Sequence, residues 1–354
     1  MRILVTGGCG FIGSAVVRRI IAASAHSVVN VDKMTYAASE AALEQARGDA
    51  RHVHVRADIA DHDAMRQIFA THQPDAVMHL AAETHVDRSI DGPGPFIHSN
   101  IVGTYTLLDV ARSYWAALPA ARARAFRFHH ISTDEVFGAL GPNDPPFTET
   151  TSYDPRSPYS ASKAASDHLV RAWHHTYGLP TIVSNTVNNY GPWQFPEKLI
   201  PLVTLNALEG KKLPVYGDGS NTRDWLFVDD HAEALLRVIE RGEPGATYAI
   251  GGRQPRSNLQ VVRAICAALD ARRPDPAGPR ERLITFVTDR PGHDFRYEID
   301  PSRSEAALDW SAPHDFTAGL ARTIDWYLAN RSWWEGIRAA RYAGERLGQG
   351  RSAA

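Results

Sequence analysis

The stretch RILVTGGCGFIG, at residues 2–13, predicts a β-strand, a glycine-rich turn and the start of a helix, which continues over residues 14–22. Small residues in such a turn let the backbone approach a pyrophosphate, and the amino terminus of the following helix favours its negative charge. The glycines Gly7, Gly10 and Gly13 follow a GxxGxxG spacing, so the GxGxxG fingerprint of dinucleotide-binding proteins is matched only loosely. The turn therefore indicates a phosphate-binding site, with a tight structural turn as the alternative.

A second predicted strand, at residues 27–32, ends in Asp32, 19 residues after Gly13. An acid at this place can accept hydrogen bonds from the ribose hydroxyls of a dinucleotide, and it would repel a 2′-phosphate. The pattern favours NAD over NADP, although the neighbouring Lys33 weakens that discrimination. A solvated loop acid is the alternative interpretation.

Strands and helices continue to alternate. Residues 52–56 and 74–82 have the composition of strands, and Asp61 is placed to cap a helix that runs to about residue 70. Strands that alternate with helices predict a parallel, doubly wound sheet, which is an α/β fold. Strict alternation ends at about residue 185, so we expect a smaller C-terminal α/β domain there.

A fifth strand is predicted to end in polar residues that are suited to acid–base chemistry. The stretch FRFHHISTDEVFG, at residues 126–138, runs from apolar residues into Thr133, Asp134 and Glu135. Ligands bind at the carboxyl ends of parallel strands, and two neighbouring acids can be given different pKa values and different roles. Taken by itself, the stretch favours turn residues that cap the next element over a catalytic site.

Tyr159 and Lys163 lie four residues apart at the start of a predicted helix, so their side chains share one face. An ammonium ion near a phenol favours the phenolate and lowers a pKa that starts near ~10. We expect Tyr159 to act as a base toward a sugar hydroxyl. The preceding residues, 138–158, hold five prolines and are predicted to form a loop that covers the site.

Composition excludes several classes of protein. The chain has 354 residues, of which 44% are hydrophobic, and 38 basic against 40 acidic groups give a net charge of -2. This balance provides no electrostatic case for nucleic acid or an anionic membrane as a partner. Cys9 and Cys266 suggest no disulfide framework, and neither a signal peptide nor an apolar run of ~18 residues is present. We expect a cytoplasmic protein with a disordered tail at residues 346–354.

Taken together, the motifs resemble the extended short-chain dehydrogenase/reductase superfamily, whose sheet is of the Rossmann type. The superfamily resemblance rests on Gly7, Gly10, Gly13, Asp32, Tyr159 and Lys163. Within the superfamily, the chain is similar to the dTDP-glucose 4,6-dehydratases. That narrower resemblance rests on residues 31–37, 80–89, 132–138, 188–192, 195–201, 214–219, 223–226 and 289–294.

The resemblance implies a lyase that uses NAD and no metal. Tyr159, assisted by Lys163, would deprotonate the C4 hydroxyl of dTDP-glucose while hydride passes to NAD⁺, and Thr133 would bond the C4 oxygen. Glu135 would remove the C5 proton, Asp134 would protonate the departing C6 hydroxyl, and hydride would return to C6. The product would be dTDP-4-keto-6-deoxyglucose, for deoxysugar or rhamnose supply.

The resemblance also implies binding residues. The cofactor set is Gly7, Gly10, Phe11, Ile12, Gly13, Asp32, Lys33, Met34, Thr35, Tyr36, Ala37, Asp58, Ile59, Leu80, Ala81, Ala82, Ser99, Tyr159, Lys163 and Asn189. The substrate set is Thr84, Thr133, Asn188, Lys198, Leu199, Pro214, Val215, Tyr216, Arg223, Asn258, Asp289, Arg290, His293 and Asp294. Five positions depart from the residues usual in the family: Thr84, Ser99, Phe137, Trp193 and Gln194.

By resemblance we expect an NAD-binding domain at residues 1–184, rejoined by about 224–251, and a sugar-nucleotide-binding domain at 185–223 and 252–340. A homodimer is expected through the helices that start near Asn100 and Tyr159.

Three alternative functions stay open. A nucleotide-sugar 4-epimerase shares the tyrosine and lysine but needs no acid pair, a related dehydratase would act on UDP- or CDP-glucose, and an NAD-sensing regulator would have lost turnover.

Overall fold

The structure is a computed structural model that describes residues 1–289, 293–344 and 347. Arg290, and the tail at 346–354 apart from Leu347, lie outside the described residues. The substrate role predicted for Arg290 and the disorder predicted for the tail therefore stay predictions.

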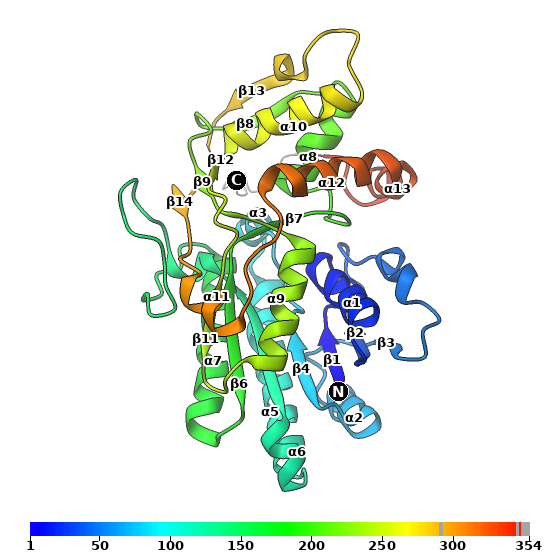
Figure 1. Cartoon of the computed structure of the whole chain (residues 1–354), viewed down its shortest axis with the longest axis vertical. Coiled ribbons are helices and arrows are strands. Elements are labelled where there is room, and N and C mark those ends of the chain that lie inside the picture. Colours follow the sequence, from blue (N-terminus) through cyan, green and yellow to red (C-terminus); the bar gives the residue numbers. More distant parts are fainter. Residues whose placement is uncertain (290–292, 345–346, 348–354) are drawn as a thin grey trace, which may run out of the picture.

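A seven-stranded, fully parallel sheet forms the centre of the larger part of the molecule, with the order β11-β6-β5-β4-β1-β2-β3 (Figure 1). Its strands are β1 (Arg2–Thr6), β2 (Ser27–Asp32), β3 (His52–Arg56), β4 (Ala76–His79), β5 (Arg127–Thr133), β6 (Thr181–Thr186) and β11 (Thr247–Ile250). The predicted doubly wound α/β fold is confirmed.

Helices cover both faces of this sheet because successive strand residues point to opposite sides. Ile3 and Val5 pack in one core with α1 (Phe11–Ala23) and α9 (Val228–Arg241), whereas Leu4 packs in a second core. The helices around the second core are α2 (His62–His72), α5 (Gly103–Ala116) and α7 (Pro158–Tyr177).

Local sequence determines where two of these helices begin. Asp61 caps α2, as predicted, because its Oδ1 accepts a hydrogen bond from the Ala64 backbone N–H at 3.0 Å. Ser157 and Ser160 form a capping box at the start of α7, which begins at Pro158.

Three predicted boundaries differ from the structure. The fourth strand covers only residues 76–79, because the chain leaves the sheet after His79 toward the cavity described below. Residues 116–125, whose Ala- and Arg-rich sequence predicts an exposed connector, contain a short helix, α6 (Ala120–Ala125), with no buried residue. Helix α5 is preceded by a π-helical segment, Ile97–Val102, so it starts three residues later than predicted.

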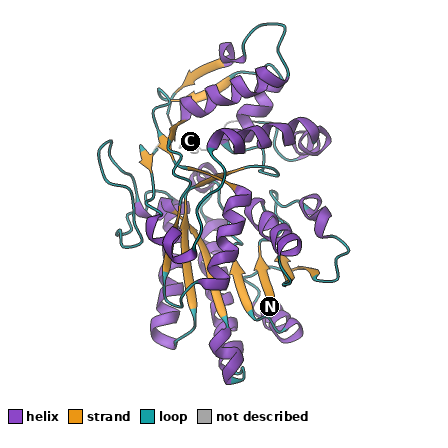
Figure 2. Cartoon of the chain, viewed as in Figure 1, coloured by secondary structure: helices purple, strands orange, loops and turns teal. Residues whose placement is uncertain are grey.

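The smaller part holds short strands and most of the remaining helices, in the upper half of Figures 1 and 2. Its two-stranded and three-stranded sheets are β10-β7, β13-β8 and β12-β9-β14. The strands are β7 (Asn188–Tyr190), β8 (Leu213–Tyr216), β9 (Thr222–Arg223), β10 (Trp225–Phe227), β12 (Arg256–Ser257), β13 (Ile284–Val287) and β14 (Arg296–Tyr297). The helices are α8 (Leu199–Leu208), α10 (Asn258–Arg272), α12 (Phe316–Ala329) and α13 (Arg331–Ala340). Short helices elsewhere are α3 (Val86–Asp91), α4 (Gly94–Phe96) and α11 (Ser302–Leu308), with 3₁₀ turns at Glu40–Ala46, Asp134–Phe137 and Arg280–Leu283.

The proline-rich loop at 138–158 does not cover the site. It runs beside residues 296–299 through bridges of Leu140 with Arg296 and of Phe147 with Ile299. None of its residues lines the cavity. Its apolar residues Leu140 and Phe147 are buried, so the loop is part of a core rather than a lid.

Cys9 and Cys266 are both buried and unpaired. Among the described residues, the helices are all too short or too polar to span a lipid bilayer.

Candidate active site

A cavity of about 290 Å³ lies where the parallel strands of the large sheet end. Residues that follow or end β1, β2, β4, β5 and β6 line it, together with the start of α7 and the segment 186–198. Crevices at this edge of a doubly wound sheet are the usual place of ligand binding.

The glycine-rich turn forms one end of the cavity and leaves no room for side chains. A Cβ on Gly7, whose φ is +73°, would lie 2.7 Å from the Ala81 Cα, and one on Gly13 would lie 2.1 Å from the Gly7 carbonyl oxygen. The first residues of α1 also line the cavity, so a helix amino terminus faces it. Both features suit a pyrophosphate group.

Asp32 is held at the cavity wall by backbone groups. Its Oδ2 accepts a hydrogen bond from the Cys9 N–H at 2.9 Å, and its Oδ1 accepts one from the Met34 N–H at 2.8 Å. The adjacent Lys33 is turned to Ser99, whose Oγ accepts from its Nζ at 2.7 Å. A carboxylate in this position fits the ribose hydroxyls of NAD.

Most predicted cofactor residues line this cavity. They are Gly7, Gly10, Phe11, Ile12, Gly13, Asp32, Lys33, Thr35, Ala37, Ile59, Leu80, Ala81, Ala82, Ser99, Tyr159, Lys163 and Asn189. Met34, Tyr36 and Asp58 do not line it. Asp58 instead accepts a hydrogen bond from the Ala60 N–H at 2.9 Å, and Tyr36 is bonded to Glu197.

Thr133, Asp134 and Glu135 stand at the end of β5, and all three line the cavity. The Thr133 hydroxyl accepts from the Glu135 N–H at 3.2 Å and donates to Asp134 Oδ1 at 3.3 Å. Burial, and then the charge of Glu135, raise the pKa of Asp134 well above its usual value. A protonated Asp134 is a proton donor, as an acid catalyst must be.

Tyr159 and Lys163 also line the cavity, but the net shift of the Tyr159 pKa in this structure is upward rather than downward as predicted. Burial, and then the charge of Glu135, raise the pKa of Tyr159 well above its usual value, although a hydrogen bond with Thr133 lowers it. Lys163 is directed into the protein, where its Nζ donates to the Ile131 carbonyl at 2.9 Å.

The predicted substrate residues fall into two groups. Thr84, Thr133, Asn188 and Lys198 line the cavity, and Lys198 Nζ donates to the Thr84 carbonyl at 2.9 Å. The others described are Leu199, Pro214, Val215, Tyr216, Arg223, Asn258, Asp289, His293 and Asp294, which do not line it. Their predicted roles stay predictions.

Arg223 connects this second group to the catalytic residues. Its guanidinium lies 4.1 Å from the centre of the Tyr297 ring, and its charge lowers the pKa of the buried Asp134 against the larger effects of burial and Glu135. The short strands β9 and β14 therefore stand close to the acid pair.

The structure shows the contacts of two residues that depart from the family pattern, Trp193 and Gln194. The Trp193 ring packs on the Trp326 and Trp333 rings, with ring centres 4.7 and 5.4 Å apart. Gln194 lines the cavity, and its Nε2 donates to the Asn189 carbonyl at 2.9 Å.

Several cavity residues had no predicted role: Val31, Ala38, Ala57, Glu83, Ile131, Ser132, Thr186, Val187, Gln194, Phe195 and Glu197. Thr186 ends β6 and Val187 follows it, so their place at a strand end was a usable signal. Glu197 had no such signal, although it joins distant segments. Its carboxylate accepts from Tyr36 and from Arg88, both at 2.8 Å, and we name these three residues the Glu197 cluster.

The sequence and the fold of this chain are similar to those of known proteins. The sequence profile of the family described as GDP-mannose 4,6 dehydratase matches residues 4–323. A dTDP-glucose 4,6-dehydratase of Escherichia coli is 58% identical over an alignment of 359 positions, which covers 98% of this chain and 99% of that protein.

Two crystal structures of dTDP-glucose 4,6-dehydratases with NAD bound have the same fold. The Streptomyces venezuelae enzyme matches with a TM-score of 0.87 at 41% identity, over 95% of this chain and 100% of that chain. The Bacillus anthracis enzyme matches with a TM-score of 0.84 at 38% identity, over 95% of this chain and 99% of that chain.

Proposed function

The chain belongs to the dTDP-glucose 4,6-dehydratase family, and on that premise we propose that it removes water from dTDP-glucose with NAD as cofactor. The product is dTDP-4-keto-6-deoxyglucose. The observation that carries the proposal is the buried Asp134 beside Glu135, in the cavity that also holds Thr133 and Tyr159.

NAD, when bound, accepts the hydride of C4 and returns it to C6. Tyr159 takes the proton of the C4 hydroxyl, while the Thr133 hydroxyl orients the C4 oxygen. The resulting ketone acidifies the C5 hydrogen, which Glu135 removes as a base. Asp134 donates its proton to the C6 hydroxyl, which departs as water, and Glu135 then returns a proton to C5.

Of the two pKa shifts that bear on this scheme, the one of Asp134 supports it directly and the one of Tyr159 does not. Asp134 has a raised pKa and is ready to donate. Tyr159 has a raised pKa as well, so it becomes a base only when positive charge nearby favours the phenolate. We propose that the ammonium of Lys163, which lines the same cavity, supplies that charge, and that an oxidised nicotinamide ring, when bound, would add to it.

The part of the molecule outside the large sheet takes the nucleotide in this proposal. Arg223 and Lys198 are the described cations predicted to meet the diphosphate. Residues 1–184 with 224–251 form the NAD-binding domain, and 185–223 with 252–340 form the sugar-nucleotide-binding domain. The product enters deoxysugar or rhamnose supply in the cytoplasm.

We also propose a homodimer. Its support is a group of large, exposed apolar side chains on or beside α5 and α7: Ile97, Val102, Tyr105 and Tyr177. Helix pairs of two copies would bury these side chains. Light scattering of the purified protein at several concentrations measures the mass directly.

The function is tested with purified protein and dTDP-glucose, with the 4-keto-6-deoxy product followed by mass spectrometry. Loss of one water from the sugar nucleotide is the expected result. UDP-glucose and CDP-glucose are tested in parallel, and turnover of either in place of dTDP-glucose would correct the substrate. Interconversion of glucose and galactose nucleotides without loss of water would indicate a 4-epimerase, and NAD binding without turnover would indicate a regulator.

A further inference from the structure

Helix α7 carries a second buried charge, Asp167, four residues after Lys163. No step of the proposed reaction uses it. Asp167 is 0% exposed and Lys163 is 4% exposed. Charged groups are costly to bury unless an opposite charge and hydrogen bonds accompany them. The Asp167 carboxylate and the Lys163 ammonium must therefore have partners that compensate for their burial.

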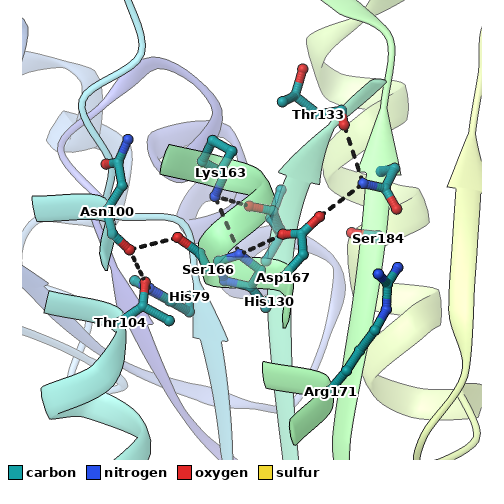
Figure 3. A network of polar contacts seen from close by, with 12 residues as sticks. His79, Asn100, Thr104, His130, Thr133, Lys163, Ser166, Asp167, Arg171 and Ser184 are labelled. Atoms are coloured by element: carbon teal, nitrogen blue, oxygen red, sulfur yellow. Dashed lines mark hydrogen bonds and ion pairs between the residues drawn. The ribbon is translucent and has the colours of Figure 1, made fainter. Parts of the chain in front are cut away.

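Lys163, His130 and Asp167 form a buried row, which Figure 3 shows between α7 and β5. Lys163 Nζ lies 3.3 Å from His130 Nε2, and the same His130 nitrogen lies 3.1 Å from Asp167 Oδ1. The imidazole thus stands between the ammonium and the carboxylate.

The other oxygen of Asp167 is bonded to neutral donors. Its Oδ2 accepts from the Tyr153 hydroxyl at 2.8 Å and from Asn185 Nδ2 at 3.2 Å. Asn185 Nδ2 also lies 3.1 Å from the Thr133 carbonyl oxygen. Asp167 therefore connects the helix of Tyr159 to the strand end that bears Thr133.

The charges in the row are one negative and one positive. Burial, and then the charge of Lys163, lower the pKa of His130 to about 4, so this imidazole is neutral at physiological pH. Burial would raise the pKa of Asp167, but the hydrogen bond with His130, the charge that His130 carries only when protonated, and the charge of Lys163 outweigh it and lower the pKa. Burial lowers the pKa of Lys163 to about 8, and the charge of Asp167 opposes that fall.

Other ionisable groups surround the row on several elements. They are His79 on β4, His129 on β5, Asp134 and Glu135 in the turn after β5, Tyr153 in the proline-rich loop, Tyr159, His168 and Arg171 on α7, and His231 on α9. Among all of these groups, Asp167 is the one whose charge raises the pKa of Lys163.

We propose that Asp167 is a positioning residue whose buried carboxylate keeps Lys163 in its ammonium form. The neutral His130 stands between the two and sets their separation. This inference rests on the proposed function, because an ammonium at Lys163 matters for catalysis only if Tyr159 acts as the base of the proposed reaction.

The proton of Lys163 can be followed directly. The chain has five lysines, at 33, 163, 198, 211 and 212, so protein with ¹³C at lysine Cε gives few NMR signals. Loss of one signal in Lys163→Arg assigns Lys163. In the unaltered holoprotein we expect its pKa to be near 8. Titration below pH 7 would overturn the proposal, because the carboxylate would then not be holding the ammonium.

The Asp167→Asn substitution removes the charge and keeps the shape. We expect the pKa of Lys163 to fall by one unit or more, which is about a tenfold loss of proton affinity. Asp109→Asn is the matched control, because it removes a half-exposed carboxylate that pairs with Arg112 at 3.2 Å on another helix. An unchanged Lys163 pKa in Asp167→Asn would overturn the proposal.

The pH profile of kcat separates this role from a structural one. Activity needs the ammonium, so it declines as pH rises through the pKa of Lys163. The lower pKa in Asp167→Asn therefore moves the alkaline limb to lower pH, and activity returns as the pH is lowered. Equal loss at every pH would contradict the proposal. Absence of turnover in the unaltered protein would refute the proposed function, while the NMR titration would still decide the role of Asp167.

Discussion

The two halves of the candidate site are built from very different elements. The inner half consists of Thr133, Asp134 and Glu135 at the end of β5, and Tyr159 and Lys163 on the 20-residue helix α7. The outer half consists of the predicted substrate residues on β8 and β9, which are strands of four and two residues.

We expect this difference to separate the residues that carry out the reaction, in the inner half, from the residues that bind the nucleotide, in the outer half. The inner residues are fixed by a buried sheet and by hydrogen bonds that span it, so their mutual positions depend on the whole fold. The outer residues depend on short strands that contribute little to the large core. We therefore expect inner substitutions to reduce kcat and outer ones to raise KM.

The largest effect is expected for Tyr159→Phe. Loss of the phenolic oxygen removes the base of the first step, which should lower kcat by about 10³-fold. NAD content and melting temperature should stay unchanged, because a phenylalanine ring retains the contact with Phe96. Tyr105→Phe, on the exposed face of α5, is the control. A kcat within tenfold of the parent would show that another group takes the proton.

Glu135→Gln should slow product formation by about 10²-fold, since it removes the base for C5 while oxidation at C4 continues. Stopped-flow absorbance of the reduced nicotinamide should therefore still rise after mixing with dTDP-glucose. The matched control is Glu44→Gln, whose side chain is 70% exposed. Dehydration at the normal rate would show that Glu135 is not the C5 base.

Arg223→Lys tests the outer half and should have the smallest effect. A lysine cannot form the paired bonds that a guanidinium makes to a phosphate group, so KM should rise about tenfold with kcat within twofold. Steady-state kinetics and a melting curve measure both values. The control is Arg66→Lys, whose side chain is 74% exposed. A fall in kcat comparable to the rise in KM would show that the two halves do not act separately.

The sequence predicted the placement of the inner residues, because they follow strong periodic elements, whereas their catalytic roles stay predictions. Thr133 ends a buried strand, and Tyr159 and Lys163 lie one turn apart on a long helix, so topology alone brings them to one sheet edge. The same periodicity predicted the order of alternating strands and helices in the large sheet.

Side-chain direction and short strands could not be predicted in the same way. Helical spacing places Lys163 on the face of Tyr159, but it does not show that the ammonium bonds to the Ile131 carbonyl. Two-residue strands such as β9 carry no periodic signal. The Glu197 cluster joins residues 161 positions apart, and nothing local indicates such a contact.

The C-terminal helix α13 has a practical consequence for handling the protein. Trp333 Nε1 donates to Ser39 Oγ at 3.1 Å, and Arg341 Nη1 donates to the Ala38 carbonyl at 3.1 Å. Both contacts fall on the segment beside the cofactor end of the cavity, where Ala38 lines the wall. The last helix of the chain thus braces the first cofactor loop. A chain truncated before residue 331 should therefore lose its NAD during purification.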